Sequence, residues 1–381
     1  MTKNQYIEIE DIKFKVKNGM LIINFRDNIE NNIEVNNLQK LKGFSELEDL
    51  NLLYLIGLNI SKIENLEHFP KLQKLNLAEN DIFKIENLSS LKNLTELDLS
   101  ENNISKLENM KSLENIEILN LAKNQIQKIE NLEKLKKLKS LNLYGNKISK
   151  IEELENLRAL LHLNLTSNRI SKIENLENLT CLRMLSLKQN RISKIEGIKV
   201  HTKLDFLGLE SNNIKRIENL EGLNQMRELN LSHNQIDLID DREYQFRANT
   251  LDLSHNKLSE ITGDIPLPVR ENIWLDYNFI TKFDSVRFPD TSRQIFLRHN
   301  LIKRIPDLDL DRFEDIKSID ISFNRLNNPE DIDQFIEFEE IYINLYGNPF
   351  CERLLREGKL IFDDEGSIIP KNTLPFSDYG I

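Results

Sequence analysis

The chain lacks any apolar run long enough to cross a membrane. Its 381 residues contain no stretch of about 18 consecutive apolar residues. The amino terminus also lacks the basic segment followed by an apolar stretch that marks a secretory signal. We therefore expect neither a membrane span nor a signal peptide.

Cysteine is almost absent, because Cys181 and Cys351 are the only two. In the repeat register described below they lie about seven coils apart, which is roughly 35 Å at the usual strand spacing. A disulfide needs Cα atoms within about 7 Å. Two free thiols are typical of a reducing compartment, so we expect a cytoplasmic or nuclear protein.

The motifs of common enzymes are missing as well. The sequence contains no G-x-x-x-x-G-K phosphate loop, no H-E-x-x-H zinc motif and no G-x-S-x-G nucleophile motif. Its six histidines are scattered without a paired nucleophile. We expect a protein that is not an enzyme and that has no cofactor.

An excess of positive charge is also lacking, since the formal net charge is −11. Binding to a phosphate backbone needs a cationic surface. A column of basic residues does recur every 22 residues from Lys62 to Arg216, but a glutamate follows each of them two residues later. A solvated face with weak ion pairs is the simpler interpretation. We expect no direct contact with nucleic acid, and a basic patch for nucleic acid stays open as the alternative.

What the chain does contain is a repeat. An asparagine recurs every 22 residues from Asn80 to Asn300, inside a frame of the form L-x-x-L-x-L-x-x-N-x-I, and two copies at a spacing of 24 end in Asn324 and Asn348. The three leucines share one side of a short extended segment, so a unit buries its apolar edge only against its neighbours. This pattern predicts an α/β leucine-rich repeat solenoid of horseshoe type with a parallel concave sheet.

The frame asparagines are expected to be structural. A carboxamide both donates and accepts hydrogen bonds, so it can bond backbone groups of its own coil and of the next. The sequence therefore predicts an asparagine ladder and no functional role for these residues.

The second half of each regular unit narrows the subclass. Residues 61–66 read SKIENL, and the same slot reads KIENL at 84–88 and RIENL at 216–220. The phrase is too short for an α-helix and suits about one 3₁₀ turn on the convex side. Here the chain resembles the 22-residue leucine-rich repeats of the protein phosphatase 1 regulatory-subunit family, whose N-x-I-x-x-I-E-x-L phrase is matched in eight consecutive units. The resemblance covers roughly residues 47–350. The resemblance implies a binding scaffold, with a serine/threonine phosphatase catalytic subunit as one candidate partner.

The ends of a solenoid need a cover. Residues 12–25 alternate around Asn18-Gly19, a strong hairpin signal that would pair Val16 with Leu21, Phe14 with Ile23 and Ile12 with Phe25. We expect an N-terminal cap with a β-hairpin over 1–46, the repeat array over 47–350, and a C-terminal cap and tail over 351–381. The array is regular to about residue 240 and irregular on its convex side afterwards, where eight of the nine prolines fall.

The inward-facing slot between the last two leucines of the frame also changes along the chain. It is small and polar in the regular half, as at Asn76 and Asp98, and it holds Trp274 and Phe296 further on. Exposed aromatic residues and arginines dominate protein-binding hot spots. The alternative is that the rings pack on one another. Our candidate partner-binding residues are Phe206, Trp274, Tyr277, Phe296, Arg298, Phe323, Tyr342 and Tyr346.

One arrangement raises the question of a metal site. His233, His255 and His299 share the position before the frame asparagine, and adjacent coils bring the first two close together with Asp252 nearby. No cysteine or carboxylate stands in their column on the coils next to them, so we expect no metal.

The leading hypothesis is a non-catalytic scaffold, monomeric by itself, that holds another protein on its concave face. Two alternatives belong to other classes. A surface adhesin would call for an export signal and an anchor. A structural subunit of a ribonucleoprotein would bring down RNA together with its partner.

Overall fold

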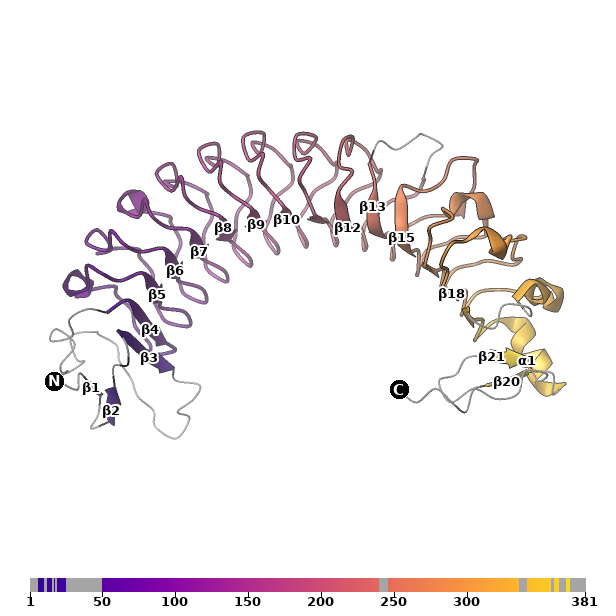
Figure 1. Ribbon diagram of the computed structural model, residues 1–381, viewed down its shortest axis with the longest axis horizontal. Helices are drawn as coiled ribbons and strands as arrows, with labels where there is room; N and C mark the ends of the chain where they lie inside the picture. The colour runs from indigo at the N-terminus through magenta and orange to yellow at the C-terminus, as the bar shows by residue number, and fades with distance from the viewer. Residues whose placement is uncertain are drawn as a thin grey trace. The chain divides into compact units, whose positions relative to one another are not determined.

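The computed structural model describes residues 6–9, 12–15, 17, 19–24, 50–239, 246–335, 341–357, 360–362 and 368–370. The chain forms two compact units. The first comprises residues 1–192 and 196–204, and the second comprises 193–195 and 205–381. In each unit, coils with one short strand apiece stack on one another (Figure 1).

In the first unit the strands from β3 onward pair in parallel and in sequence order. Their register repeats the frame, since Leu75 pairs with Leu97 and Leu97 pairs with Leu119. The strands are β3 (Met20–Asn24), β4 (Leu52–Ile56), β5 (Lys74–Asn76), β6 (Glu96–Asp98), β7 (Ile118–Asn120), β8 (Ser140–Asn142), β9 (His162–Asn164) and β10 (Met184–Ser186).

The second unit continues the same parallel pairing, and additional short elements interrupt it. The main strands are β11 (Phe206–Gly208), β12 (Met226–Asn230), β13 (Ala248–Asp252), β15 (Val269–Trp274), β17 (Gln294–Phe296), β18 (Ser318–Asp320) and β19 (Tyr342–Asn344). The pair β14 (Glu260–Ile261) and β16 (Lys282–Phe283) forms a separate parallel sheet. Helix α1 (Pro349–Arg356) follows, and β20 (Leu360–Phe362) pairs antiparallel with β21 (Ile368–Pro370).

The frame leucines form the core of each unit. Leu72, Leu75 and Leu77 are at most 1% exposed, and the convex residues Ile82 and Ile85 are fully buried. Each such side chain contributes about 1.5–3 kcal/mol when it leaves water. Because these positions recur in every regular coil, the core is continuous through a unit. The predicted parallel solenoid is therefore confirmed.

The asparagine ladder is present, and it runs towards the preceding coil. Asn124 is typical: its Oδ1 accepts the Ile104 N–H at 2.9 Å, and its Nδ2 donates to the Leu99 carbonyl at 2.9 Å. Nδ2 also donates to the carbonyls of Leu121 and Ala122 in its own coil, both at 3.2 Å. The partners lie one coil back because the side chain turns inward beneath the strand that it follows. Each buried carboxamide thus satisfies backbone groups in two coils.

The convex phrase differs from the predicted 3₁₀ turn in its position. The 3₁₀ turns Leu66–His68 and Met110–Ser112 begin at the last residue of the phrase, directly after Asn65 and Asn109. Both asparagines have left-handed backbone conformations, with φ of 57° and 58°. Asparagine tolerates this conformation better than most residues. The left-handed residue ends the extended part of the phrase, which is why the 3₁₀ turn starts later.

This second asparagine column forms its own ladder, which the sequence analysis missed. Asn87 Nδ2 donates to the Ile63 carbonyl at 2.7 Å, and Asn109 Nδ2 donates to the Ile85 carbonyl at 2.6 Å. The recurring Asn in IENL, a residue type that favours the left-handed conformation, was the available signal.

The ion pairs expected on the convex face are few and exposed. Lys84 Nζ lies 3.4 Å from Glu86, while Lys172 Nζ lies 3.9 Å from Glu196 of the next coil. Pairs of this kind contribute little to stability.

The N-terminal elements confirm the predicted turn and correct the predicted ladder. Lys17 and Met20 exchange backbone hydrogen bonds of 3.0 and 2.9 Å around Gly19. However, β2 (Ile12–Lys15) forms its ladder with β1 (Tyr6–Ile9), and β3 joins β4 in parallel. Docking β3 on the array buries its alternate residues Leu21 and Ile23, which a two-stranded ribbon could not achieve. Val16, Asn18 and Phe25 of the predicted hairpin lie outside the described residues.

Both cysteines are free thiols, as predicted. Cys351 is buried in α1, and burial raises the pKa of its thiol to about 12. Within the described ranges, no helix has the length and hydropathy of a membrane span.

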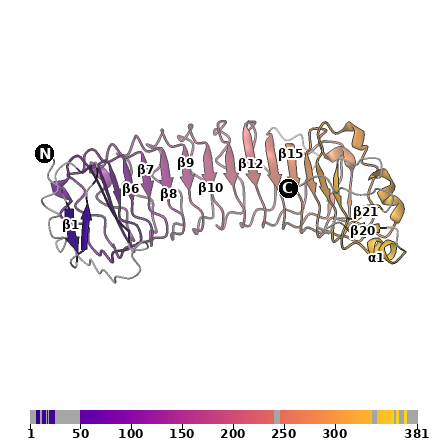
Figure 2. The ribbon, with the colours of Figure 1, turned by 60° about the horizontal axis from the view of Figure 1, so that its bottom comes forward.

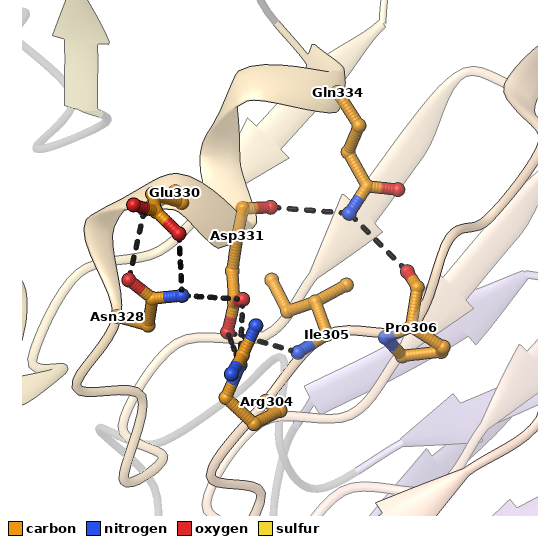
Figure 3. A network of polar contacts seen from close by, with 7 residues as sticks. All are labelled: Arg304, Ile305, Pro306, Asn328, Glu330, Asp331 and Gln334. Atoms are coloured by element: carbon orange, nitrogen blue, oxygen red, sulfur yellow. Dashed lines mark hydrogen bonds and ion pairs between the residues drawn. The ribbon is translucent and has the colours of Figure 1, made fainter.

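On the irregular convex side of the second unit, where the repeat phrase is absent, polar side-chain contacts connect neighbouring segments (Figure 3). The buried carboxylate of Asp331 accepts the Arg304 Nε–H at 2.8 Å and the Ile305 N–H at 3.2 Å. Gln334 accepts the Leu308 N–H at 3.0 Å and donates to the Pro306 carbonyl at 3.2 Å. These contacts fasten the 3₁₀ helix Pro329–Phe335 to the preceding coil.

Candidate functional site

The small polar residues of the inward slot have a structural task that the sequence analysis did not recognise. Asn76 Oδ1 accepts the Ala78 N–H at 2.8 Å, and Asn164 Oδ1 accepts the Thr166 N–H at 3.0 Å. The same bond, from the slot residue to the amide two positions later, occurs at Asp252 and Asp320 in the second unit. The slot is therefore a column of Asx turns that caps the strand ends.

Trp274 and Phe296 interrupt this column, as Gly208 does on β11, because none of these residues has a side-chain acceptor. The register places Asp252, Trp274, Phe296 and Asp320 next to one another on β13, β15, β17 and β18. In the second unit β12 and β15 lie in the same sheet, with β13 between them (Figure 2). Two aromatic rings thus replace two turn-forming residues, with an aspartate on either side.

The structure supplies a substitute acceptor at one of the two interruptions. The Arg298 N–H, two positions after Phe296, donates to Asp276 Oδ1 of the adjacent coil at 2.8 Å. Asp276 therefore supplies the acceptor that an Asn or Asp in the slot supplies in other coils. Phe296 itself accepts no hydrogen bond from the Arg298 N–H.

The two rings meet edge to face and remain partly exposed. Their centroids are 6.4 Å apart with an interplanar angle of 65°, a geometry that aromatic pairs favour. The Nε1 of Trp274 is buried and finds no hydrogen-bond acceptor among the described residues. A buried indole N–H usually has a partner.

A second aromatic feature lies at the position before the frame asparagine, where the backbone is left-handed. His233, His255, Tyr277, His299 and Phe323 have φ between 51° and 54° there. Their rings stack face to face, with successive centroid distances of 4.0, 4.3, 4.4 and 4.4 Å. We call these five residues the ring column. The sequence analysis had noted its members separately, as three histidines and two candidate binding residues.

The ring column ends at Tyr346 and Gly347. The Tyr346 ring stands edge-on to Phe323 at 5.2 Å, and the Arg298 guanidinium lies 5.2 Å from the Phe323 centroid. A Cβ on Gly347, whose φ is 73°, would lie 2.6 Å from the Phe323 ring. The structure therefore brings Tyr277, Arg298, Phe323 and Tyr346 together.

The stacking argues against a metal between His233 and His255. Their planes are 10° apart at a centroid distance of 4.0 Å, so the nitrogen lone pairs lie in nearly parallel planes and do not converge on one ion. Across the described part of the chain, no three His, Cys, Asp or Glu side chains are grouped as a metal site.

Two predicted site residues lie apart from the others. Phe206 is on β11, which is separated from β15 by β12 and β13. Its ring covers Gly208, where a Cβ would lie 2.9 Å from the ring. Tyr342 is on β19, is 41% exposed and pairs with Ser318.

Negative charge surrounds the Trp274–Phe296 pair. The pKa of Asp276 is raised to about 6, mainly by burial; the hydrogen bond from the Arg298 N–H and the Arg298 charge act to lower it, and the charges of Asp320 and Asp252 act to raise it. Burial is also the main cause of the raised pKa of Glu228, which Glu210 and Asp252 reinforce. In the described ranges, no Lys, Arg or His side chain forms an ion pair with Asp252, Asp276 or Asp320.

Models of leucine-rich repeat families match separate stretches of the chain. A model of two leucine-rich repeat copies matches residues 114–156 and 158–200. A single leucine-rich repeat model matches residues 90–106 and 224–238. No curated protein sequence matches the chain.

Solved structures share the fold. A leucine-rich repeat protein of Leptospira interrogans is 22% identical with a TM-score of 0.70, covering 80% of this chain and 86% of that one. The leucine-rich repeat domain of APL1B is 21% identical with a TM-score of 0.68, covering 84% and 93%. The internalin InlF of Listeria monocytogenes is 24% identical with a TM-score of 0.63, covering 81% and 84%. At this level of identity the similarity concerns the fold alone.

The repeat frame, the parallel coils and these matches together define the chain as a leucine-rich repeat protein. Leucine-rich repeat folds generally act as non-catalytic binding scaffolds, and no model of a catalytic family matches.

Proposed function

We propose that this protein is a non-catalytic scaffold that holds another protein on the inner face of its second unit, around Trp274 and Phe296. The observation that carries the proposal is the interruption of the Asx-turn column. The Asn and Asp residues of the slot cap strand ends in both units, whereas these two rings accept no such bond and remain partly exposed. Residues that the fold does not need, placed on a binding face, support a role in recognition.

The neighbouring residues fit a contact surface of useful size. Tyr277 and Tyr346 are 41% and 44% exposed, and Arg298 is exposed beside Phe323. Tyrosine, tryptophan and arginine are the side chains most enriched at binding hot spots. Because the ring column holds Tyr277 between two histidine rings, its side chain loses little further conformational freedom on binding.

Three kinds of partner are distinguishable by experiment. The repeat phrase that resembles phosphatase 1 regulatory subunits makes a serine/threonine phosphatase catalytic subunit the first candidate, in the cytoplasm or nucleus. The internalin-like fold keeps a host or surface protein as a second candidate, for an adhesin. A ribonucleoprotein would be identified by RNA that copurifies with the wild type and is lost together with the protein partner.

Affinity capture from native lysate tests the proposal. We expect the wild type to capture a partner that a Trp274→Ala, Phe296→Ala variant loses. Asn120→Ala, Asn142→Ala is a matched control, because it changes the same slot in the first unit. The identified partner, once purified, should bind the control with wild-type affinity. Equal capture by wild type and the aromatic variant would place the binding site elsewhere.

A further inference from the structure

We propose that the Trp274–Phe296 face is a binding site for the guanidinium of an arginine in an extended basic segment of the partner. This inference rests on the proposed function and adds the chemistry of the ligand. It follows from three features of the same few strands: paired rings, surrounding carboxylates and the absence of an ion pair to those carboxylates among the described residues.

The ring pair has a carboxylate on the strand at either side. Trp274 and Phe296 lie side by side on β15 and β17, while Asp252 and Asp320 occupy the same slot on the outer neighbours β13 and β18. Asp276, two residues beyond the end of β15, accepts the Arg298 N–H from the next coil and lies near enough to Asp252 and Asp320 for their charges to act on its carboxyl. A cation over the rings would therefore have three carboxylates around it.

The three carboxylates are engaged mainly by neutral hydrogen-bond donors. Asp252 Oδ1 accepts the Ser254 N–H and Oγ–H, and Asp320 accepts the Ser322 N–H and the Asn344 Nδ2–H. Asp276 accepts the Arg298 N–H. For Asp276, burial penalises the charged form and is the main cause of its raised pKa. An arriving guanidinium would relieve that cost.

Nearby cations do not fill this role. Arg298 is the closest arginine, and its guanidinium is placed over the Phe323 ring at 5.2 Å from the centroid. His255 and His299 stand in the ring column, and burial lowers the pKa of both. An incoming charge on the Trp274 face therefore meets a net negative field.

The ring pair selects an organic cation over a metal ion. A guanidinium is planar, stacks on an indole face and offers several N–H groups to carboxylates. Within the described residues, by contrast, no group of three carboxylates or histidines converges as metal ligands. An arginine can satisfy both the aromatic faces and the carboxylates at once.

Asp98 provides a matched control in the first unit. It occupies the same slot, caps Ser100 and accepts the Asn120 Nδ2–H at 3.0 Å, as Asp320 does from Asn344. Its slot neighbours are Asn76 and Asn120 instead of aromatic rings. Removing its charge changes the net charge by one and leaves the aromatic face intact, so it matches each single substitution at Asp276 or Asp320.

Tryptophan fluorescence tests the site directly, because Trp274 is the only tryptophan. The probe is a capped peptide, Gly-Arg-Gly-Ser-Arg-Gly, and the neutral control replaces both arginines with citrulline. We expect saturable change of the Trp274 emission with the arginine peptide only. Asp276→Asn, Asp320→Asn should weaken its affinity about tenfold or more, since a partly desolvated charge contact is removed. Asp98→Asn should leave the affinity within about twofold.

Three results would overturn the cation site: equal binding of the citrulline peptide, an equal loss in Asp98→Asn, or an unchanged emission up to millimolar arginine peptide. Far-UV circular dichroism verifies that the variants fold, and asparagine keeps one of the two acceptor oxygens at each position, in the test variant and in the control alike. If the Trp274→Ala, Phe296→Ala variant loses the partner but the arginine peptide does not bind the wild type, the proposed function stands and the cation site is removed. If the variant still captures the partner while the wild type binds the arginine peptide specifically, the cation site stands and the proposed function is removed.

Discussion

The inward slot behaves differently in the two units. In the first unit, residues such as Asn76, Asp98 and Asn142 each accept the amide two positions later and hold the strand end in place. In the second unit, Trp274 and Phe296 stand in the same register and form no such bond. A slot residue can therefore either accept the amide two positions later and stabilise the strand end, or make no such hydrogen bond. We place recognition at Trp274 and Phe296, which make none.

The position before the frame asparagine gives a parallel contrast. Glu79, Glu101 and Lys123 fill it in the first unit with left-handed backbones and exposed or half-exposed side chains. In the second unit the same backbone geometry carries the ring column. The fold fixes the backbone and leaves the side chain free, so the two units can differ on their surfaces without differing in their coils.

The largest expected effect separates the frame asparagine from the slot asparagine. Asn124→Ala removes one acceptor and three donated bonds, leaving buried backbone groups in two coils unsatisfied. We expect a loss of about 3–5 kcal/mol in the free energy of unfolding. Asn142→Ala removes one partly buried bond and should cost about 1 kcal/mol. Urea unfolding followed by circular dichroism measures both, and similar losses would contradict the distinction.

This distinction also marks how far the sequence could predict the structure. A strict asparagine spacing within a leucine frame determines the strands and the ladder, because a buried carboxamide has few alternatives. The slot residues looked like free surface, since their spacing does not show that the side chain bonds the amide two positions later. The Asn in IENL recurs as well, and its role was overlooked because spacing does not show the left-handed backbone that it adopts.

A smaller effect is expected from two glycines that share the left-handed position. Gly145 lies in the first unit, where a Cβ would meet Lys123 at an ordinary 3.4 Å, while a Cβ on Gly347 would lie 2.6 Å from the Phe323 ring. We expect Gly145→Ala to cost about 1 kcal/mol and Gly347→Ala about 3 kcal/mol, because only the latter must displace the ring column. Denaturant unfolding of both variants checks this, and equal costs would show that the ring yields easily.

The smallest expected effect is a pH dependence confined to the second unit. The pKa of Asp276 is raised from 3.8 to about 6 in the folded state. The folded state therefore binds more protons than the unfolded state between these values, so stability falls as pH rises from about 4 to about 6 and is level above it. Solvent screening limits the change to about 1 kcal/mol. Urea unfolding at pH 4.5 and 7, followed by Trp274 emission, should show a smaller difference in Asp276→Asn than in wild type. An unchanged difference would exclude Asp276 as its source.

The candidate site was predictable in part. Trp274 and Phe296 could be identified because a period of 22 residues makes any departure in one column visible. The ring column was only partly foreseen, since stacking depends on side-chain orientation at a left-handed backbone. The carboxylate of Asp276 gave no signal at all, because its role arises from the residue that it serves in the neighbouring coil.

The most direct test of the central claim restores the repeat in the second unit. Trp274→Asn, Phe296→Asn places the usual slot residue where the rings stand, so each asparagine can accept the amide two positions later as Asn164 does. Circular dichroism should give a free energy of unfolding within about 1 kcal/mol of wild type, since the gained bonds offset the lost ring burial. Affinity capture with the same variant should lose the partner. A variant that unfolds, or one that keeps the partner, would contradict the claim that these rings serve recognition and not the fold.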